Sequence, residues 1–340
     1  MFEKQIKIPD PEILVGQMPL PASLKKIKAE RDRLVSDVIS GKSDKLIIIV
    51  GPCSAHEAAP VLEYVERLGR LNERVKDKLV LVPRIYANKP RTRGVGYKGM
   101  FSQPDPTKSE DILKGIFAIR ELNIKAIEAS GLSAADEMLY PANIHYVDDL
   151  LSYIAVGARS SENQLHRLVS SGIDVPVGIK NPMSGSVKVM LNSIYAAQSG
   201  QIFKLNGWQV KTNGNPLAHA ILRGAVDGYG NDIPNFHYET VMQVIEGYAQ
   251  SGLKNPAIII DANHSNSGKK FKQQIRICEE VMQNRLYDND FKRNLKGFMI
   301  ESFLEEGCQA EDKIYGKSIT DPCLGWQDTE RLILDIAEKV

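Results

Sequence analysis

The feature of this sequence that most constrains its fold is a series of eight short, nearly continuous apolar runs rich in β-branched residues. Strands buried on both faces have this composition, whereas half-exposed antiparallel strands alternate apolar and polar residues. The eight predicted strands are residues 46–50, 79–86, 125–130, 153–158, 175–180, 201–206, 257–263 and 297–303. The pattern therefore predicts a sheet of buried parallel strands.

Segments with helical spacing of apolar residues lie between these strands. The clearest are residues 58–75, 109–122, 161–171, 184–198, 269–285 and 328–340. Eight strands that alternate with helices favour a closed (β/α)8 barrel, or TIM barrel, over an open doubly wound sheet. We therefore expect an α/β protein whose residues 46–340 form one such barrel.

Two segments depart from the repeat. Residues 1–45 form an N-terminal arm with a proline-punctuated start and a predicted helix that Ser23 begins as its N-cap. This arm is too short to bury apolar residues such as Ile6 and Ile13 by itself, so we expect it to pack on the barrel floor or make an oligomeric contact with a neighbouring subunit. Residues 207–237 are rich in Gly, Asn and Pro and predict a long loop after the sixth strand.

Composition excludes several classes of protein. The 340 residues include 43 Lys+Arg and 42 Asp+Glu, and this balance argues against a nucleic-acid partner. No run reaches the roughly 20 apolar residues of a membrane span, and the first residues lack the apolar core of a signal peptide. We therefore expect a cytoplasmic protein with no membrane partner. Four cysteines in such a chain predict thiols rather than a disulfide framework.

In a (β/α)8 barrel the active site lies at the C-terminal ends of the strands. The candidate metal ligands there are Cys53, His264, Glu301 and Asp321. A thiolate, an imidazole and two carboxylates suit a divalent transition-metal ion. Each residue also has a structural alternative: Cys53 could pack in the core, His264 could be a turn residue, Glu301 could pair with a barrel lysine, and Asp321 before Pro322 could cap a helix. Their gathering at one rim favours the metal site.

Cations are also concentrated at this rim. They are Arg84, Lys89, Arg91, Arg159, Lys180 and Arg223, with Lys204 on the sixth predicted strand. The third predicted strand contributes an acidic residue, Glu128. Unpaired buried charges are costly, so this surplus predicts an anionic ligand held by guanidinium forks. A capping sequence from Ser161 to Gln164 predicts a helix N-terminus that also attracts an anion. The alternative for any one arginine, Arg223 in particular, is a surface salt bridge.

Several motifs, in order along the chain, resemble one enzyme family. They are GPCS (51–54), KPRT (89–92), GAR (157–159), PVGIKN (176–181), LRG (222–224), HSNSGK (264–269) and GKSITDPCLGW (316–326). Together they are similar to the motifs of class I 3-deoxy-D-arabino-heptulosonate 7-phosphate (DAHP) synthases, and in particular to the microbial subgroup with an N-terminal arm. The resemblance runs from about residue 46 to the C-terminus and more loosely through the arm.

The resemblance implies a transferase with a (β/α)8 barrel. It implies a metal-dependent condensation of phosphoenolpyruvate with erythrose 4-phosphate, with release of phosphate, as the first step of the shikimate pathway to aromatic amino acids. The implied cofactor is a divalent metal ion, Mn²⁺, Fe²⁺ or Co²⁺, and the implied assembly is a homodimer or homotetramer.

The resemblance also implies roles for individual residues. Cys53, His264, Glu301 and Asp321 resemble the metal ligands, and Arg84, Arg159, Lys180 and Arg223 resemble the phosphoenolpyruvate clamp. Lys89, Arg91 and Thr92 resemble the part that faces the aldose phosphate, and Glu137 resembles a further substrate contact. Lys89 and His264 are the candidates for proton transfer.

Some positions depart from the family pattern. Arg93 and Gly94 follow KPRT as an apparent insertion, and KNPMSGS (180–186) replaces a loop richer in Asp and Thr. Tyr140, Pro141 and Asp174 do not match the aromatic amino-acid pocket of feedback-inhibited members, so regulation is not carried over.

Two rival functions are a related synthase that uses arabinose 5-phosphate and a catalytically silent, effector-binding barrel. KPRT and SITDPCLGW disfavour the first. The second predicts loss of a ligand or clamp residue, and none is lost.

Overall fold

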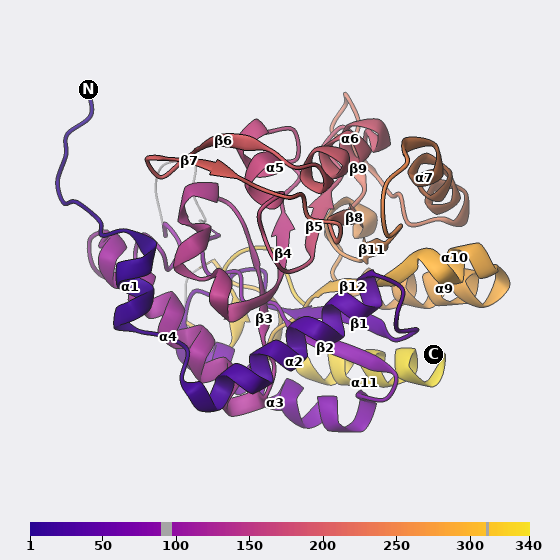
Figure 1. Ribbon diagram of the computed structural model, residues 1–340. Helices are drawn as coiled ribbons and strands as arrows, with labels where there is room; N and C mark the ends of the chain where they lie inside the picture. Colours follow the sequence, from indigo (N-terminus) through magenta and orange to yellow (C-terminus); the bar gives the residue numbers. More distant parts are fainter. Residues whose placement is uncertain (90–96, 311–312) are drawn as a thin grey trace.

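The protein folds into a closed parallel barrel, described here from a computed structural model for residues 1–89, 97–310 and 313–340 (Figure 1). Its strands are β1 (Leu46–Gly51), β2 (Leu79–Pro83), β3 (Ala134–Glu137), β4 (Leu151–Val156), β5 (Val177–Lys180), β8 (His219–Leu222), β11 (Ile258–Asp261) and β12 (Leu295–Glu301). They pair in the order β2-β1-β12-β11-β8-β5-β4-β3, and a parallel bridge between Arg84 and Ala135 closes the ring. The predicted (β/α)8 barrel is confirmed.

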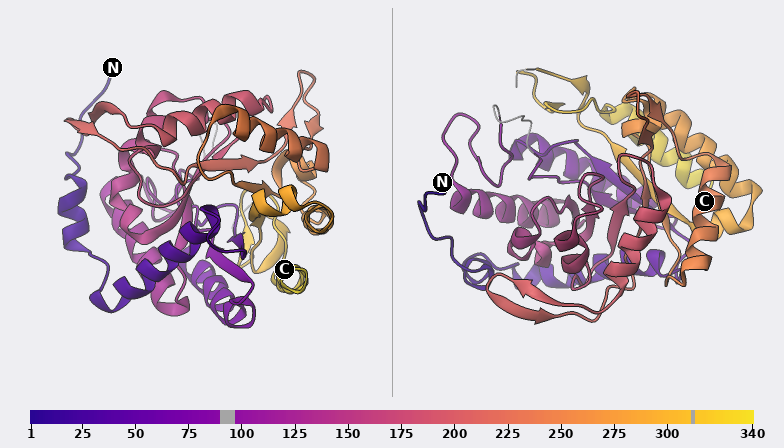
Figure 2. Two further views of the ribbon diagram at one scale, coloured as in Figure 1. Left: turned by 45° about the vertical axis from the view of Figure 1, so that its right-hand side comes forward. Right: turned by 90° about the horizontal axis from the view of Figure 1, so that it is seen from above.

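Helices surround the barrel (Figure 2). They are α3 (Ala58–Val75), α4 (Ile112–Ser130), α5 (Gln164–Ser170), α6 (Val187–Gln198), α7 (Tyr238–Ser251), α9 (Gln273–Tyr287), α10 (Asn289–Asn294) and α11 (Trp326–Glu338). Short helical turns, η1 (Pro141–Tyr146), η2 (Asp148–Leu150) and α8 (His264–Ser267), lie in the connections. The predicted helix 58–75 is observed with the same limits, and the other predicted helices begin within a few residues of their predicted starts, whereas α7 and α10 were not predicted. None of the described helices is long and apolar enough to cross a bilayer.

The predicted third strand is wrong. Residues 125–130 belong to α4, because Ala126 and Ile127 lie on its buried face and Glu128 is exposed at a helical spacing. The third barrel strand is β3, whose sequence AADE has no apolar excess.

The predicted sixth strand is also wrong. Residues 201–206 contribute β6 (Ile202–Leu205), which pairs antiparallel with β7 (Trp208–Lys211) in a hairpin outside the barrel. Residues of β6 alternate between exposed and half-buried, as expected for a strand on the surface. The sixth barrel strand, β8, lies inside the segment predicted to be a loop, residues 207–237.

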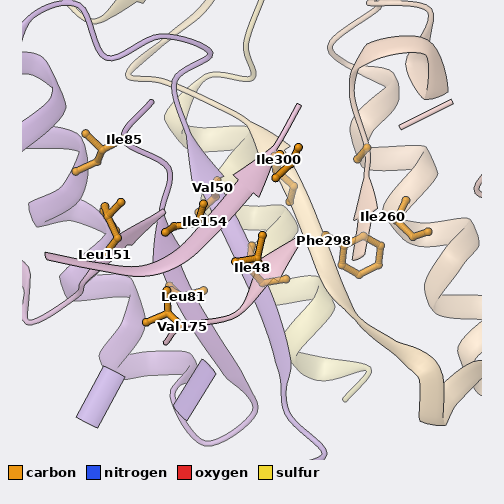
Figure 3. Close-up of a cluster of buried hydrophobic side chains, with 14 of the residues drawn as sticks. Ile48, Val50, Leu81, Ile85, Leu151, Ile154, Val175, Ile260, Phe298 and Ile300 are labelled. Carbon is orange, nitrogen blue, oxygen red and sulfur yellow. The ribbon is translucent and has the colours of Figure 1, made fainter. Parts of the chain in front are cut away.

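The core has two layers. The outward-facing side chains of the strands, such as Ile48, Leu81 and Phe298, pack in one cluster with the surrounding helices (Figure 3). The inward-facing side chains form a second cluster with Val35, Val38 and Ile39 of α2 (Ala22–Ile39). The arm helix α2 therefore closes the N-terminal floor of the barrel and leaves the opposite end for a site.

The first part of the arm also docks on its own barrel. Leu14 of α1 (Pro11–Gln17) is buried, and Arg120 of α4 donates to the carbonyl oxygen of Met18 and pairs with Asp149 at 2.7 Å. Tyr146 Oη donates to the carbonyl oxygen of Pro9 at 2.8 Å. Residues 1–7 are exposed, and Figure 1 shows the N-terminus directed away from the barrel.

Candidate active site

Three of the four predicted metal ligands converge at the C-terminal end of the barrel. One ligand atom from each of Cys53, Glu301 and Asp321 lies within 4.8 Å of the others. The register of the strands explains this, because Gly51 of β1 pairs with Glu301 of β12 and Cys53 follows two residues later. Asp321 lies in the loop before α11, which begins at Trp326 with Gly325 as its N-cap. Asp321 therefore does not cap that helix.

The fourth predicted ligand, His264, lies at the edge of this cluster. It begins α8 directly after β11, with a positive φ of 49°. Its Nδ1 lies 2.8 Å from Asp261 Oδ2, and its Nε2 lies 3.8 Å from Glu301 Oε1. A carboxylate on one ring nitrogen orients an imidazole and raises the basicity of the other nitrogen, which is a common arrangement for histidine ligands.

The side chain of Lys89 lies among the acidic groups. Its Nζ is 2.8 Å from Cys53 Sγ, 3.8 Å from Glu301 Oε1 and 4.0 Å from Asp321 Oδ2. Lys269 Nζ contacts the other oxygen of Asp321 at 3.1 Å. The three clustered side chains are thus arranged around a positive charge, and their S and O donors, with the imidazole beside them, fit a divalent transition-metal ion.

Glu301 is held as a carboxylate by its buried neighbours. Arg84 Nη2 donates to its Oε1 at 3.0 Å, and Asn263 Nδ2 donates to its Oε2 at 2.5 Å. Burial alone would raise the pKa of Glu301, but the charges of Arg84, Lys89 and His264 lower it to about 2. Burial, and then Glu301, raise the pKa of the Cys53 thiol. Because a coordinating thiol must lose its proton, a bound cation would have to offset that shift.

Arg84 is buried and already positioned. Its Nη1 donates to the carbonyl oxygen of Pro52, and its guanidinium carbon lies 3.7 Å from the ring centre of Tyr86. Its Nε has no hydrogen-bond partner within the described residues. This N–H group is therefore a buried donor that the described residues leave unsatisfied.

Cations form a second side of the rim. Lys180 Nζ pairs with Asp261 Oδ2 at 2.8 Å, and both side chains are buried. Arg223 Nη1 donates to Ser265 Oγ at 3.0 Å, and burial, together with the charge of Arg159, lowers its pKa. Arg159 itself is exposed. The charges of Asp261 and Asp232 act in the opposite direction and raise the pKa of Arg223.

Glu137 lies beside the start of the predicted anion-binding loop. A Cβ atom at Gly157 would lie only 2.0 Å from Glu137 Oε1, so a larger residue at the first position of the GAR motif would displace the Glu137 carboxylate. The helix that follows, α5, is capped by Asn163, whose side chain accepts from the backbone N–H of His166 at 3.2 Å. The predicted cap at Ser161 is therefore wrong by two residues.

Sequence reasoning missed two buried carboxylates. Asp261 ends β11, and its place at the end of a predicted strand is the same signal that identified Lys180. Asp136 lies on β3 and accepts from Asn88 Nδ2 at 3.4 Å; burial raises its pKa well above the usual range. Asp136 was missed because the third strand was predicted at residues 125–130 instead of at β3.

A buried network of asparagines was also missed. Asn181 Oδ1 accepts from the backbone N–H of Arg223 and from Asn235 Nδ2, each at 3.0 Å. Asn266 Oδ1 accepts from the backbone N–H of Asn235 at 2.8 Å. The network joins the loops after β5, β8 and β11 and fixes the backbone of Arg223. Only the tertiary contacts between these loops reveal it.

Four other predicted site residues have different outcomes. Glu128 is exposed on α4 and Lys204 is exposed on β6, so neither lies at the end of a barrel strand. Arg91 and Thr92 lie outside the described residues.

Comparisons with known proteins identify the family of this chain. The sequence profile of the DAHP synthetase I family matches residues 20–333. The chain is similar to the Phe-sensitive phospho-2-dehydro-3-deoxyheptonate aldolase of Escherichia coli (strain K12), with 38% identity over 99% of this chain and 96% of that protein. It is similar to the Trp-sensitive aldolase of Enterobacter agglomerans, with 38% identity over 97% of this chain and 94% of that protein.

A solved structure gives the same result. The phospho-2-dehydro-3-deoxyheptonate aldolase from Francisella tularensis SCHU S4 superimposes with a TM-score of 0.91 and 30% identity, over 100% of this chain and 98% of that one. Because the family profile and these relatives extend over almost the whole chain, the chain belongs to the DAHP synthetase I family.

Proposed function

We propose that the chain is a metal-dependent phospho-2-dehydro-3-deoxyheptonate aldolase, a transferase that condenses phosphoenolpyruvate with erythrose 4-phosphate as the first step of the shikimate pathway. The observation that supports it best is the cluster of Cys53, Glu301 and Asp321 beside a rim of cations. Few reactions need both a divalent-metal site and enough positive side chains to bind two phosphate groups and a carboxylate.

Cys53, His264, Glu301 and Asp321 hold a divalent ion in this proposal, with Mn²⁺, Fe²⁺ or Co²⁺ as candidates because mixed S, N and O donors accept several such ions. When bound, the ion supplies Lewis-acid chemistry at the aldehyde oxygen of erythrose 4-phosphate. Asp261 orients the imidazole of His264 through their 2.8 Å contact.

The cations bind and orient phosphoenolpyruvate. Arg159 and Arg223 hold one anionic group, and Lys180 and the free Nε of Arg84 hold another. Lys89, Arg91 and Thr92 bind the aldose phosphate, and Glu137 contributes a further contact beside Gly157. Their charges offset the repulsion between two anionic substrates and fix the reacting carbons in place.

The reaction forms one carbon–carbon bond and one carbon–oxygen bond to water, and it breaks the carbon–oxygen bond to phosphate. C3 of phosphoenolpyruvate bonds to C1 of the aldose, water adds at C2, and inorganic phosphate leaves. Lys89 donates a proton to the aldehyde oxygen. The added water loses two protons, of which one restores the ammonium group of Lys89 and the other leaves with phosphate. Burial lowers the pKa of Lys89, but Cys53 and Glu301 outweigh burial and raise it, so Lys89 is an ammonium group at neutral pH. In this proposal His264 acts as a ligand and not in proton transfer, because its Nδ1 faces Asp261 and its Nε2 faces the ion site beside Glu301.

The test is a steady-state assay of phosphate release before and after metal removal. We expect exhaustive chelation to abolish turnover and Mn²⁺, Fe²⁺ or Co²⁺ to restore it. Cys53→Ser should lower metal affinity or turnover at least about 10-fold. The matched control is Cys308→Ser, since Cys308 is an exposed free thiol on β13 (Glu305–Cys308). Full turnover with a verified absence of metal would refute metal dependence.

The same assay separates the rival activities. Erythrose 4-phosphate is expected to be the productive aldose and arabinose 5-phosphate to give little product. Product from arabinose 5-phosphate alone would identify the related synthase, and no product from either sugar in metal-loaded protein would identify a silent barrel.

A further inference from the structure

A basic cavity lies at the N-terminal floor of the barrel, at the opposite end from the candidate active site. It has a volume of about 550 Å³ and is lined by residues at the end of α2, at the starts of β1, β11 and β12, and on the pair α9–α10. Figure 1 labels these elements. The charged residues that line it are Asp44, Lys45, Arg285, Lys292, Arg293 and Lys296. Five cations therefore face a single carboxylate within the described lining.

Arg285 of α9 is the most unusual of these residues. The residue is only 4% exposed, and its Nε has no hydrogen-bond partner within the described residues. No ion pair of the described chain involves Arg285, and Asp44 acts on it only through its charge. A guanidinium buried in this way normally has an anionic partner, because an unpaired buried charge is costly.

A second cation reaches the cavity from the barrel floor. Lys296, the second residue of β12, is 8% exposed. Its Nζ lies 3.8 Å from the position of a Cβ atom at residue 41, where Gly41 has a positive φ of 76° and leaves space. Lys296 Nζ therefore lies next to the turn that follows α2, at the edge of the cavity.

The other cations lie farther out. Lys292 and Arg293 are exposed on α10, where Arg293 pairs with Asp290 at 2.5 Å. Lys45 donates from its Nζ to the carbonyl oxygen of Lys76 at 2.6 Å. The cavity therefore has a buried pair of cations at its base and further positive charge at its mouth.

We propose that this cavity binds a small organic polyanion with two phosphate groups. One phosphate contacts Arg285 and Lys296 at the base, and the other contacts Lys292 and Arg293 at the mouth. The volume is in the range of small-metabolite sites. A sugar bisphosphate and a nucleoside diphosphate share this chemistry.

The site is separate from the one that binds the substrates. Lys45 precedes β1, Pro256 precedes β11 and Leu295 begins β12, so the cavity lies at the starts of three strands whose other ends lead to Cys53, His264 and Glu301. Variants at either end of these strands can therefore distinguish the two sites.

The experiment is isothermal titration calorimetry of the full chain with pyrophosphate, fructose 1,6-bisphosphate and ADP. Arg285→Gln should weaken binding of the preferred probe at least about tenfold, as expected for loss of a charged hydrogen bond. Arg70→Gln is the matched control, because Arg70 is exposed on α3 and does not line the cavity. Arg223→Gln, which alters the candidate active site, should leave this binding intact.

The three probes identify the source of the two phosphates. Tighter binding of fructose 1,6-bisphosphate or of ADP than of pyrophosphate assigns the site to a sugar bisphosphate or to a nucleotide, and fructose and adenosine should not bind. The proposal is overturned if no probe binds at millimolar concentration. It is also overturned if Arg285→Gln binds like wild type, or if Arg223→Gln alone abolishes binding.

Thermal unfolding shows whether the Arg285→Gln variant is folded. Without a polyanion, Arg285→Gln should be at least as stable as wild type, because it removes an unpaired buried charge. Saturating pyrophosphate should then raise the Tm of wild type more than that of the variant. If Arg285→Gln does not fold, Lys296→Met, which keeps the aliphatic stem of the side chain, provides the same comparison.

Discussion

Asp261 joins the two parts of the candidate site, because its Oδ2 lies 2.8 Å from both Lys180 Nζ and His264 Nδ1. Burial alone would raise its pKa, but the charges of His264 and Lys180 hold the pKa of this carboxyl well below its usual range. One buried carboxylate thus fixes a residue of the proposed substrate clamp and the proposed imidazole ligand.

Replacing this charge tests its role. Asp261→Asn keeps the size of the side chain but leaves Lys180 as a buried, unpaired cation, so we expect stability to fall by about 3–5 kcal/mol. The kcat/KM for phosphoenolpyruvate should fall at least about 10-fold, because the clamp and the imidazole lose their orientation. Asp148→Asn removes a similar contact with a histidine, at His145, on the surface and is the control for both measurements. Unchanged kcat/KM in Asp261→Asn would contradict this role.

His219 gives a pH-dependent contribution to stability. Its Nδ1 faces the carbonyl oxygen of Leu217 at 2.8 Å and so carries the proton, while Nε2 accepts from Tyr153 Oη at 2.8 Å. Burial lowers its pKa from 6.5 to about 4. Below pH 6.5 the unfolded state binds one more proton than the folded state. The free energy of unfolding therefore decreases as the pH is lowered, until the folded histidine also titrates near pH 4.

The shift corresponds to about 3 kcal/mol over this window. Urea unfolding at pH 7.5 and pH 4.5 should show a larger loss of stability for wild type than for His219→Gln, since the variant lacks the titrating group. Carboxylates titrate equally in both proteins, so the difference isolates the histidine. Equal losses would show that this histidine does not titrate as described.

At the scale of elements, α2 covers the N-terminal end of the barrel and packs against its inward-facing side chains. Ile39 is fully buried in the inner cluster with Ile47, Ile49 and Val80 of the first two strands. Ile39→Ala should lower the free energy of unfolding by about 2–5 kcal/mol, because it leaves a cavity in a close-packed layer. Ile112→Ala is the matched control, since Ile112 is 41% exposed at the start of α4. A loss no larger than that of the control would mean that α2 is not part of the cooperative core.

The sequence pattern identifies those elements whose burial is uniform. Runs such as LIIIV and AIIIDAN are apolar on both faces, so six predicted strands overlap β1, β2, β4, β5, β11 and β12. The pattern is insufficient for β3, which is AADE, and for residues 125–130, whose apolar residues fit a helix face as well as a strand. There, pairing with neighbouring strands rather than composition determines the structure.

Site residues can likewise be predicted only where the strand that carries them can be predicted. Cys53, Lys180 and Glu301 can be predicted because their strands are identified and their register brings the ends together. Asp136 cannot be predicted, because the sequence pattern does not identify β3, the strand that carries it. The asparagines at 181, 235 and 266 act through contacts between loops that are distant in sequence.

At the scale of the whole molecule, residues 1–7 are exposed although the rest of the arm packs on its own barrel. Phe2 is fully exposed and Ile6 is 76% exposed, which is unusual for large apolar side chains near one another in the chain. We propose that this segment contacts a second copy of the chain in a homodimer or homotetramer. The prediction concerns the assembly alone, because residues 1–7 contribute nothing to the buried core.

Deleting residues 1–7 should weaken that assembly and leave the barrel folded. Sedimentation velocity across low micromolar concentrations should show the truncated chain dissociating where the full chain stays assembled, with equal Tm for the separated subunits. A Phe2→Ser, Ile6→Ser double variant keeps the length of the arm and should behave like the truncation, because burial of these two side chains supplies the association energy. If truncated and full-length chains sediment alike at every concentration, the exposed segment is not a subunit contact. If only the truncation dissociates, backbone contacts of the arm rather than its apolar side chains hold the subunits together.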